Sequence, residues 1–447
     1  MNRLYFGDNL KWLSDRKEFP DASVDLVYLD PPFNSNADYN VLFREPSGQV
    51  SQAQFHAFTD TWSWADAADT YHQFVDNCSN IAVVELMEAL HSFLKHSPMM
   101  AYLAMMAPRL VELHRVLKDT GSLYLHCDPT ASHHLRTVLD GIFGNRNFIN
   151  EISWKRTTTK SDFRQGAKNW PRIRDVIHHY AKDSSKLATF NQPFGAYSEE
   201  YIDAKYHLQD PDGRRYMLDN LTAPGAGSRG HPQYEIFGVT RYWRYGKEKM
   251  QKLIEEGRVV QPSPRAVPRY KRYLDEVKGI AIGDTWEDIS AINSQAKERL
   301  GYDTQKPLAL LERIISASSN PGDVVLDPFC GCGTTIHAAQ KLERQWIGID
   351  ITYLAINLIK RRLKDAFGEE IEFEEKGQPT DFAGARQLAE NDKFQFQHWA
   401  LSLIGARPLK EGEGKGADRG VDGLLYYYET ERKDLINRVK EEWAGSA

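Results

Sequence analysis

The stretch DVVLDPFCGCGTT, residues Asp323–Thr335, combines a short apolar run with glycines at Gly331 and Gly333 and the polar pair Thr334-Thr335. We predict a buried strand, a tight turn and a helix start at which the two threonines act as caps. Glycine permits backbone angles that other residues avoid, and free amides at a helix start attract anionic groups such as a carboxylate. Taken alone, the turn fits a purely structural connection as well as a ligand site.

The next apolar run, Gln345–Asp350, ends in a carboxylate about twenty residues after the turn, the spacing at which an acid bonds ribose hydroxyls in nucleoside-binding sheets. A phosphate loop of the Walker type needs Gly-Lys-Ser/Thr, whereas Gly333 is followed by Thr334. A nucleotide triphosphate is therefore disfavoured. We predict instead a nucleoside with an amino-acid tail, the tail held at the turn and the sugar at Asp350.

A third apolar run, Ser23–Asp30, leads into the tetrapeptide Asp30-Pro31-Pro32-Phe33. A carboxylate and a backbone carbonyl that accept both N–H groups of an exocyclic amine localise its lone pair and offset the charge that develops when the nitrogen gains a methyl group. The prolines fix the backbone, and Phe33 offers a flat face on which an extruded base can stack. The alternative reading is a strand end beside a buried phenylalanine.

Three predicted strands end at Asp-Pro, namely at Asp30-Pro31, Asp128-Pro129 and Asp327-Pro328. Proline cannot continue a ladder, so each pair marks the carboxyl edge of a strand, where open α/β sheets bind their ligands. Helical patterns separate the strands. We therefore predict an α/β fold with a mostly parallel sheet. Its other elements are a strand at Gly121–Cys127, helices at Ala101–Leu117 and Gln305–Ala317, and edge strands at Phe148–Lys155 and Asp175–Lys182.

Between residues 183 and 297 the pattern loses its regularity, which indicates an inserted domain with exposed loops. The net charge is −6, yet residues 241–273 hold ten Lys/Arg against three Glu, with five Tyr/Trp interleaved. Such a segment can dock phosphates, although a solvated helix with core aromatics has the same composition. The candidate DNA contacts are Arg241, Arg244, Lys247, Arg269, Lys271 and Arg272 in this segment, and Arg156, Lys160 and Arg164 in a second basic stretch.

The length of 447 residues allows two or three structural units. No leader or long apolar span is evident, which predicts a cytoplasmic protein without a membrane partner. The four cysteines are too few for a disulfide framework. Cys330-x-Cys332 lacks a second ligand pair, so we expect no metal site.

Taken together, these motifs resemble those of the amino-group DNA methyltransferases, specifically the group in which the catalytic motif precedes the cofactor motif. The matching segments are Gly7-Asp8-Asn9-Leu10, Asp30-Pro31-Pro32-Phe33, Thr304-Gln305-Lys306-Pro307 with Leu308 and Leu311, Asp327–Thr335, and Asp350. The family more often has Ser where this chain has Cys332. Five matches in this order form a specific signal.

The resemblance implies S-adenosylmethionine as cofactor and a permuted Rossmann-like sheet. The strand that normally follows the ribose acid is then Arg3–Phe6, which would bring Asp8 beside Asp350 and make the strands ending at Asp30 and Asp327 neighbours. Asp30, Pro31, Pro32 and Phe33 are the implied catalytic residues. The implied cofactor contacts are Asp8, Asn9, Leu10, Asp30, Gln305, Lys306, Pro307, Asp327, Phe329, Gly331, Gly333, Thr334, Thr335 and Asp350.

The implied organisation is a catalytic half at residues 1–182, a target-recognition insertion at 183–297, a cofactor half at 298–366, and an appendage at 367–447. The appendage resembles a truncated restriction-endonuclease-like module, with Asp422 at the position of a metal-binding acid.

The implied substrate is double-stranded DNA with a flipped base. A cognate restriction endonuclease and a second copy of the chain are the other expected partners. Adenine N6 is favoured because Asp at the first catalytic position is commoner among the adenine enzymes. Cytosine N4 remains an alternative, as do a nuclease and a non-catalytic DNA-binding protein of the same ancestry.

Overall fold

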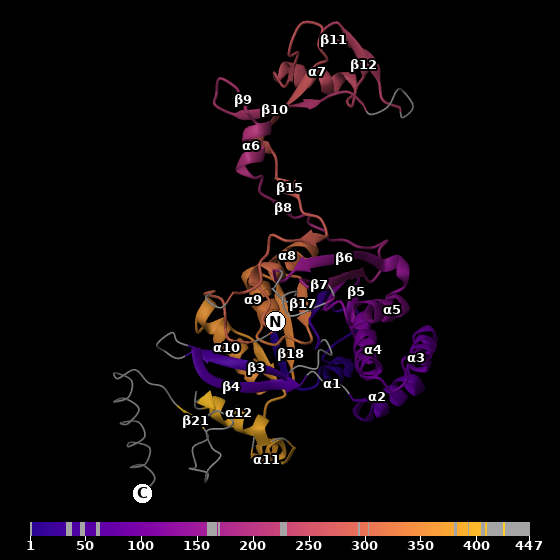
Figure 1. Ribbon diagram of the computed structural model, residues 1–447, viewed down its shortest axis with the longest axis vertical. Helices are drawn as coiled ribbons and strands as arrows, with labels where there is room; N and C mark the ends of the chain where they lie inside the picture. The colour runs from indigo at the N-terminus through magenta and orange to yellow at the C-terminus, as the bar shows by residue number, and fades with distance from the viewer. Residues whose placement is uncertain are drawn as a thin grey trace, which may run out of the picture. The chain divides into compact units, whose positions relative to one another are not determined.

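The computed structural model describes residues 2–32, 38–44, 50–59, 63–158, 168, 170–223, 230–293, 296–302, 304–379, 382–391, 393–403, 407–408 and 423–424. The chain forms two compact units, one from Met1–Asn191 with Gly283–Ala447 and the other from Gln192–Ile282 (Figure 1). The second unit lies inside the predicted insertion of 183–297 and is shorter at both ends. In the described part of the chain, every helix is too short or too polar to cross a membrane.

The first unit is built on a nine-stranded sheet. Its strands are β1 (Arg3–Phe6), β2 (Val24–Leu29), β5 (Leu117–Cys127), β6 (Phe148–Lys155), β7 (Arg174–Ala181), β16 (Thr285–Trp286), β17 (Val324–Asp327), β18 (Gln345–Asp350) and β19 (Glu374–Lys376). They lie in the order β16-β6-β7-β5-β2-β17-β18-β1-β19. β7 runs antiparallel to β5 and β6, and the remaining pairs are parallel. The predicted mostly parallel α/β sheet is confirmed.

The permuted order of the strands is confirmed as well. β1 pairs with β18 in parallel, so that Phe6 lies opposite Asp350, and β2 pairs with β17 through Leu26 and Val27. The amide of Gly7 then donates to the carbonyl of Asp350 at 2.9 Å. The carboxyl ends of four strands far apart in the sequence therefore meet at one edge of the sheet.

Two groups of helices cover this sheet (Figure 1). The first contains α1 (Asn9–Ser14), α2 (Trp64–Asn77), α3 (Ile81–Leu94), α4 (Pro98–Val116) and α5 (Ser132–Phe143), and the second contains α8 (Leu308–Ser318), α9 (Thr334–Lys341) and α10 (Tyr353–Phe367). The central helix α4 begins at Pro98 after the capping hydroxyl of Ser97, and it continues through Pro108. An internal proline costs a helix about 3 kcal/mol. Burial of most of the side chains of α4 in the main core offsets this cost.

The residues after Phe367 depart from the predicted appendage. β19 joins the main sheet beside β1, with Arg3 opposite Glu374, because β1 would otherwise present an unpaired edge. The main sheet therefore extends past the predicted boundary at residue 367. α11 (Phe382–Asn391), α12 (Lys393–Leu403) and the pair β20 (Arg407–Pro408) and β21 (Gly423–Leu424) follow. Asp422 lies outside the described residues.

The second unit has a core of its own, formed by Leu221, Ile236, Trp243, Met250 and Val259. Trp243 is fully buried and donates its Nε1–H to the carbonyl of Tyr234 at 2.7 Å, so part of the aromatic content of the basic segment is core. The elements of this unit are β8 (Phe194–Gly195), α6 (Glu199–Lys205), β9 (Leu208–Gln209), β10 (Arg215–Asn220), β11 (Gln233–Ile236), β12 (Val239–Tyr242), α7 (Lys247–Glu255), β13 (Val259–Val260), β14 (Arg269–Tyr273) and β15 (Ile280–Ala281). In the first unit, β3 (Asp38–Arg44) and β4 (Val50–Thr59) form a further hairpin.

Candidate active site

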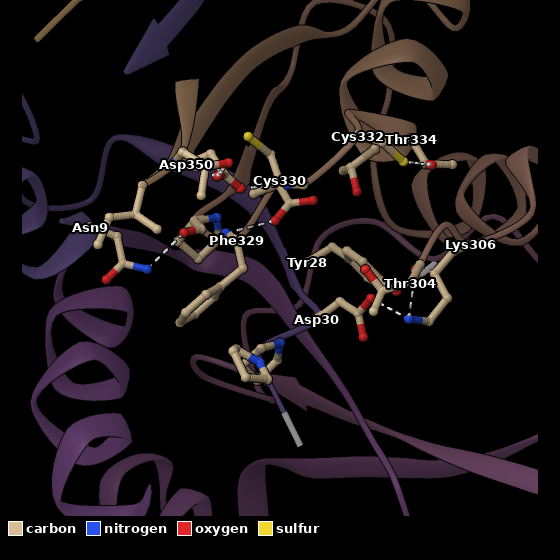
Figure 2. Close-up of a pocket in the computed structure, with 18 of the residues that line it drawn as sticks. Asn9, Tyr28, Asp30, Thr304, Lys306, Phe329, Cys330, Cys332, Thr334 and Asp350 are labelled. Atoms are coloured by element: carbon tan, nitrogen blue, oxygen red, sulfur yellow. Dashed lines mark hydrogen bonds and ion pairs between the residues drawn. The ribbon is translucent and has the colours of Figure 1, made fainter. Parts of the chain in front are cut away.

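A cavity of about 330 Å³ opens at the carboxyl edge of the sheet, where β2, β17, β18 and β1 end. Figure 2 shows its side chains converging from segments that are more than three hundred residues apart in the sequence. The lining residues are Gly7, Asp8, Asn9, Tyr28, Asp30, Pro31, Pro32, Met105, Met106, Arg109, Tyr302, Thr304, Lys306, Leu311, Asp327, Pro328, Phe329, Cys330, Gly331, Cys332, Thr334, Thr335, Asp350, Ile351 and Thr352. Most of the predicted catalytic and cofactor residues thus lie in one wall. Phe33 lies outside the described residues.

Asp30 follows the last residue of β2 and lines the cavity. Its Oδ2 forms an ion pair with the ammonium of Lys306, which also donates to the carbonyl of Thr304 at 3.4 Å (Figure 2). Its Oδ1 is buried and has no hydrogen-bond partner among the described residues. Lys306, predicted as a cofactor contact, therefore fixes the orientation of Asp30 and leaves one acceptor oxygen unused.

The glycine-rich turn adopts left-handed backbone angles, with φ of +48° at Gly331 and +74° at Gly333. A Cβ at Gly333 would lie 2.7 Å from Ile359, so glycine is required there for space as well as for backbone angle. Gly333 is the N-cap of α9, and no side chain caps this helix. The prediction that Thr334 and Thr335 are caps is therefore wrong, because both already lie within the first turn of α9.

Asp350 closes the turn from the opposite side. The amide of Gly331 donates to Asp350 Oδ2 at 2.9 Å, and Thr352 donates its amide and hydroxyl to Oδ1 at 2.9 and 3.0 Å. Burial raises the pKa of Asp350 to about 6 despite these bonds. The sequence predicts free amides at this turn that could bind the carboxylate of a ligand. The Gly331 amide instead donates to Asp350, a carboxylate of the protein.

Asp327, at the end of β17, is a second carboxylate that burial destabilises. Burial raises its pKa to about 7, although the amide of Phe329 donates to its Oδ1 at 3.0 Å. With Asp30 and Asp350, it gives the lining of the cavity three carboxylates. Such a wall favours a ligand with positive charge.

Arg109 joins the N-terminal segment to the turn, and the sequence did not single it out as a site residue. From α4 it donates to Asp8 Oδ1 at 2.8 Å and to Asn9 Oδ1 at 2.6 Å, and Asn9 donates in turn to the carbonyl of Pro328 at 2.7 Å. An arginine within the otherwise apolar run of α4 is the signal that could have indicated this role.

Four of the predicted cofactor contacts do not line the cavity. Gln305 accepts from the amide of Leu300 at 2.8 Å and donates to the carbonyl of Glu298 at 2.6 Å, so it shapes its own loop. Pro307 precedes α8 as its N-cap. Leu10 contributes its amide to Asp8 Oδ1 at 2.8 Å, and Gly333 contributes the turn itself. The segments that resemble the family's motifs therefore contain residues that shape the surrounding loops but do not line the cavity.

Tyr28 begins a buried chain of polar groups that leaves the cavity. Its hydroxyl lies 2.9 Å from His126 Nδ1, and His126 Nε2 lies 3.2 Å from Asp175 Oδ2. Arg156 reaches the same carboxylate, with its Nε 3.3 Å from Asp175 Oδ1. Although burial opposes it, hydrogen bonding to His126 lowers the pKa of Asp175. The predicted DNA contact Arg156 is thus tied to the cavity wall through three side chains.

The other predicted DNA contacts differ in their exposure and in the partners that they already have within the protein. In the second unit, Lys271 lies in a largely buried pair with Asp210 at 2.6 Å, and Arg272 pairs with Asp219. Arg244 donates to the carbonyl of Thr222 at 3.2 Å, and the ammonium of Lys247 lies 5.9 Å from the ring centroid of Tyr234. Arg241, Arg244 and Lys247 are exposed and Arg269 is half-buried, whereas Lys160 and Arg164 lie outside the described residues. Lys271 serves the internal packing of its unit.

The two cysteines of the turn are wall residues. Burial raises the pKa of the thiols of Cys330 and Cys332. Cys332 Sγ lies 3.6 Å from the hydroxyl of Thr334. Within the described ranges, no three His, Cys, Asp or Glu side chains are arranged to hold a metal ion.

Residues 24–361 match the family model of the DNA methylases. The chain is 34% identical over 341 residues to the type II methyltransferase M.EcaI of Enterobacter cloacae, a match that covers 75% of this chain and 64% of that protein. It is 28% identical over 359 residues to the Mod subunit of the type III restriction-modification enzyme StyLTI of Salmonella typhimurium, covering 77% of this chain and 50% of that protein. The matches therefore span between half and two thirds of these relatives. The solved structure of the PvuII DNA methyltransferase (cytosine-N4-specific) covers 91% of this chain and 94% of its own, with 11% identity and a TM-score of 0.40.

The hydrogen-bonded chain from Tyr28 to Asp175 predicts that two Tyr→Phe substitutions differ in their effect on the free energy of unfolding. Tyr28→Phe removes a hydroxyl bonded to His126, whereas Tyr353→Phe removes a buried hydroxyl that has no partner in the described part of the chain. We expect Tyr28→Phe to lower the free energy of unfolding by about 1–2 kcal/mol, and Tyr353→Phe to leave it unchanged or raise it. Chemical denaturation of both variants measures the difference. Equal losses would contradict a bonded role for Tyr28.

Proposed function

Because this chain belongs to the DNA methylase family, we propose that it transfers the methyl group of S-adenosylmethionine to an exocyclic amino nitrogen in double-stranded DNA, with adenine N6 as the target. The observation that carries the proposal is the unused Oδ1 of Asp30, a buried acceptor in the same cavity as the glycine-rich turn and Asp350. An exocyclic amine is a poor nucleophile that needs such an acceptor to react.

The residues of the cavity fit S-adenosylmethionine. A volume of about 330 Å³ lies within the range of small-molecule and cofactor sites. The cofactor carries a sulfonium and an ammonium against a single carboxylate, so it is a net cation, and Asp327 and Asp350 supply complementary charge. We assign Asp350 to the ribose hydroxyls, Asp8 to the adenine end, and the residues of the glycine-rich turn to the amino-acid tail.

When bound, S-adenosylmethionine supplies a methyl group that is already activated by its positively charged sulfur. The chain then has to orient the attacking nitrogen and exclude water. Asp30 Oδ1 and the carbonyl of Pro31 accept the two N–H groups of the amine, which directs the nitrogen lone pair away from the base ring and offsets the developing positive charge. Lys306 holds the other oxygen of Asp30 and so keeps the carboxylate in place.

The target base has to leave the duplex to reach this cavity, because its amino group is otherwise stacked and paired. Pro31 and Pro32 line the cavity that the base would enter. We assign the stacking role to Phe33, the last residue of the same tetrapeptide. Asp30 at the first position of the tetrapeptide supports adenine, since Asp is commoner there among the adenine enzymes of the family.

The second unit, Gln192–Ile282, is assigned to target recognition. Its exposed cations Arg241, Arg244 and Lys247 are available for phosphates, whereas Lys271 is not. The relatives from type II and type III restriction-modification systems support a role in protecting host DNA, with a cognate endonuclease as the functional partner.

Asp30→Asn tests the catalytic assignment. We expect transfer of tritiated methyl groups from S-adenosylmethionine to DNA to fall by about 10²-fold or more, while cofactor affinity persists. Asp128→Asn is the matched control, because Asp128 also ends a strand before a proline but does not line the cavity. Undiminished transfer by Asp30→Asn would contradict the assignment.

Sequencing of host DNA for modified bases is expected to reveal N6-methyladenine, and N4-methylcytosine would overturn the choice of base alone.

Cofactor affinity is expected to depend on pH through the buried carboxylates. Burial raises the pKa of Asp327 to about 7 and that of Asp350 to about 6, so both become neutral as the pH falls through this range. A neutral carboxyl group attracts a cationic ligand less and accepts ribose hydroxyls less well. We therefore expect weaker binding at pH 5 than at pH 8, measured by titration calorimetry. Asp350→Asn should flatten this dependence, and an unchanged profile in the variant would contradict the role of Asp350.

A further inference from the structure

The hairpin β11–β12 of the second unit presents an aromatic ring to solvent at its tip. Its two-residue turn consists of Phe237 and Gly238, with φ of +47° and +77°. Turns of this kind favour Asn-Gly, since both central residues are left-handed, and a bulky residue at the first position is strained. The ring of Phe237 is nevertheless 46% exposed, so burial does not compensate for the strain. A strained, exposed aromatic at a tip suggests a function for that ring.

A second left-handed residue lies on the neighbouring loop. Arg265 has a φ of +66° and is exposed. The side-chain amide of Gln261 donates to the carbonyl of Phe237 at 3.2 Å and to the carbonyl of Ala266 at 2.9 Å. One amide therefore ties the hairpin tip to the loop that carries Arg265, and the aromatic ring and the guanidinium are presented by a shared support.

The hairpin is also anchored from within its unit. Ile236, the residue before Phe237, is 5% exposed and packs with Trp243 and Met250 in the core of this unit. The tip cannot fold back without removing Ile236 from that core. A cleft lined by Phe237, Lys247, Gln251 and residues near them lies beside the tip.

The charge around the tip favours a polyanion. Residues 230–273 contain ten Lys/Arg and four Glu, with no Asp. Arg258, Lys271 and Arg272 are held by Glu276, Asp210 and Asp219. The exposed cations Arg241, Lys247 and Arg265 lie on the hairpin, on α7 and on the adjoining loop. Apolar side chains that enter base steps and cations that contact phosphates commonly occur together in DNA-binding surfaces.

We propose that the β11–β12 hairpin is a DNA wedge, in which Phe237 inserts between base pairs of the bound duplex and Arg265 contacts the adjacent phosphates. The proposal rests on the proposed function, because it takes double-stranded DNA as the partner of the second unit. It adds the residue that unstacks the duplex, and it gives a physical reason for the left-handed phenylalanine.

The test uses the full chain and a set of duplexes that contain its methylation site, each with one 2-aminopurine at a different position along the site. Phe237→Asn removes the ring but suits the left-handed turn, and Phe237→Trp keeps a stacking surface. Phe194→Asn is the matched control, since Phe194 is 41% exposed in the same unit. We expect Phe237→Asn to weaken DNA binding at least tenfold and to lose the fluorescence increase of unstacked 2-aminopurine. Phe237→Trp and Phe194→Asn should resemble the unaltered chain.

Hydrogen exchange of the amides of β11 and β12 reports on the fold of the second unit in each variant. Binding of S-adenosylmethionine reports on the first unit, which forms the proposed cavity. Arg265→Ala should reduce the slope of log affinity against log salt by about one. Wild-type DNA affinity and fluorescence in Phe237→Asn would overturn the wedge, as would an equal loss in Phe194→Asn. Failure of the unaltered chain to bind or methylate any DNA would instead overturn the proposed function, so the two failures are distinguishable.

Discussion

Parallel pairing between β1 and β18 is the contact on which the site depends. Four residues of the N-terminal strand lie opposite Ile347–Asp350, and the amide of Gly7 completes the ladder at the carbonyl of Asp350. The chain direction then brings Asp8 and Asn9 to the glycine-rich turn, where Arg109 fixes both. Without this pairing, the two ends of the first unit would contribute to separate surfaces.

Electrostatics in the cavity follow from that convergence. Three strand ends place Asp30, Asp327 and Asp350 in one wall, and burial makes a charged form costly for Asp327 and Asp350. Asp30 differs because Lys306 pairs with it. The wall therefore combines one compensated carboxylate, which presents a fixed acceptor, with two carboxylates suited to a cationic ligand. Under the proposed function, Asp30 serves the reacting end of the cavity, and Asp327 and Asp350 serve the end that binds the cofactor.

Local patterns predict most strands of the main sheet and the edge at which the motifs meet, because Asp-Pro ends and apolar runs depend on nearby residues. The order of the strands and the place of Arg3–Phe6 are implied by the family resemblance instead. The short strands β16 and β19 were not predicted. Side-chain partners could not be predicted in this way. Lys306 and Asp30 are 276 residues apart, and the role of Arg109 depends on how α4 packs. The sequence predicts free amides at the turn, because it does not reveal that the Gly331 amide donates to Asp350. Likewise, Gln305 belongs to a matching motif yet bonds its own loop.

We propose that the permuted sheet builds one cavity for both the cofactor and the reacting amine. A crystal structure of the full chain with S-adenosylmethionine tests it most directly. We expect the ribose at Asp350, the adenine end toward Asp8, and the methyl group directed toward Asp30 Oδ1. A cofactor bound elsewhere, or bound in this cavity with its methyl group directed away from Asp30, would show that the cavity does not serve both ligands.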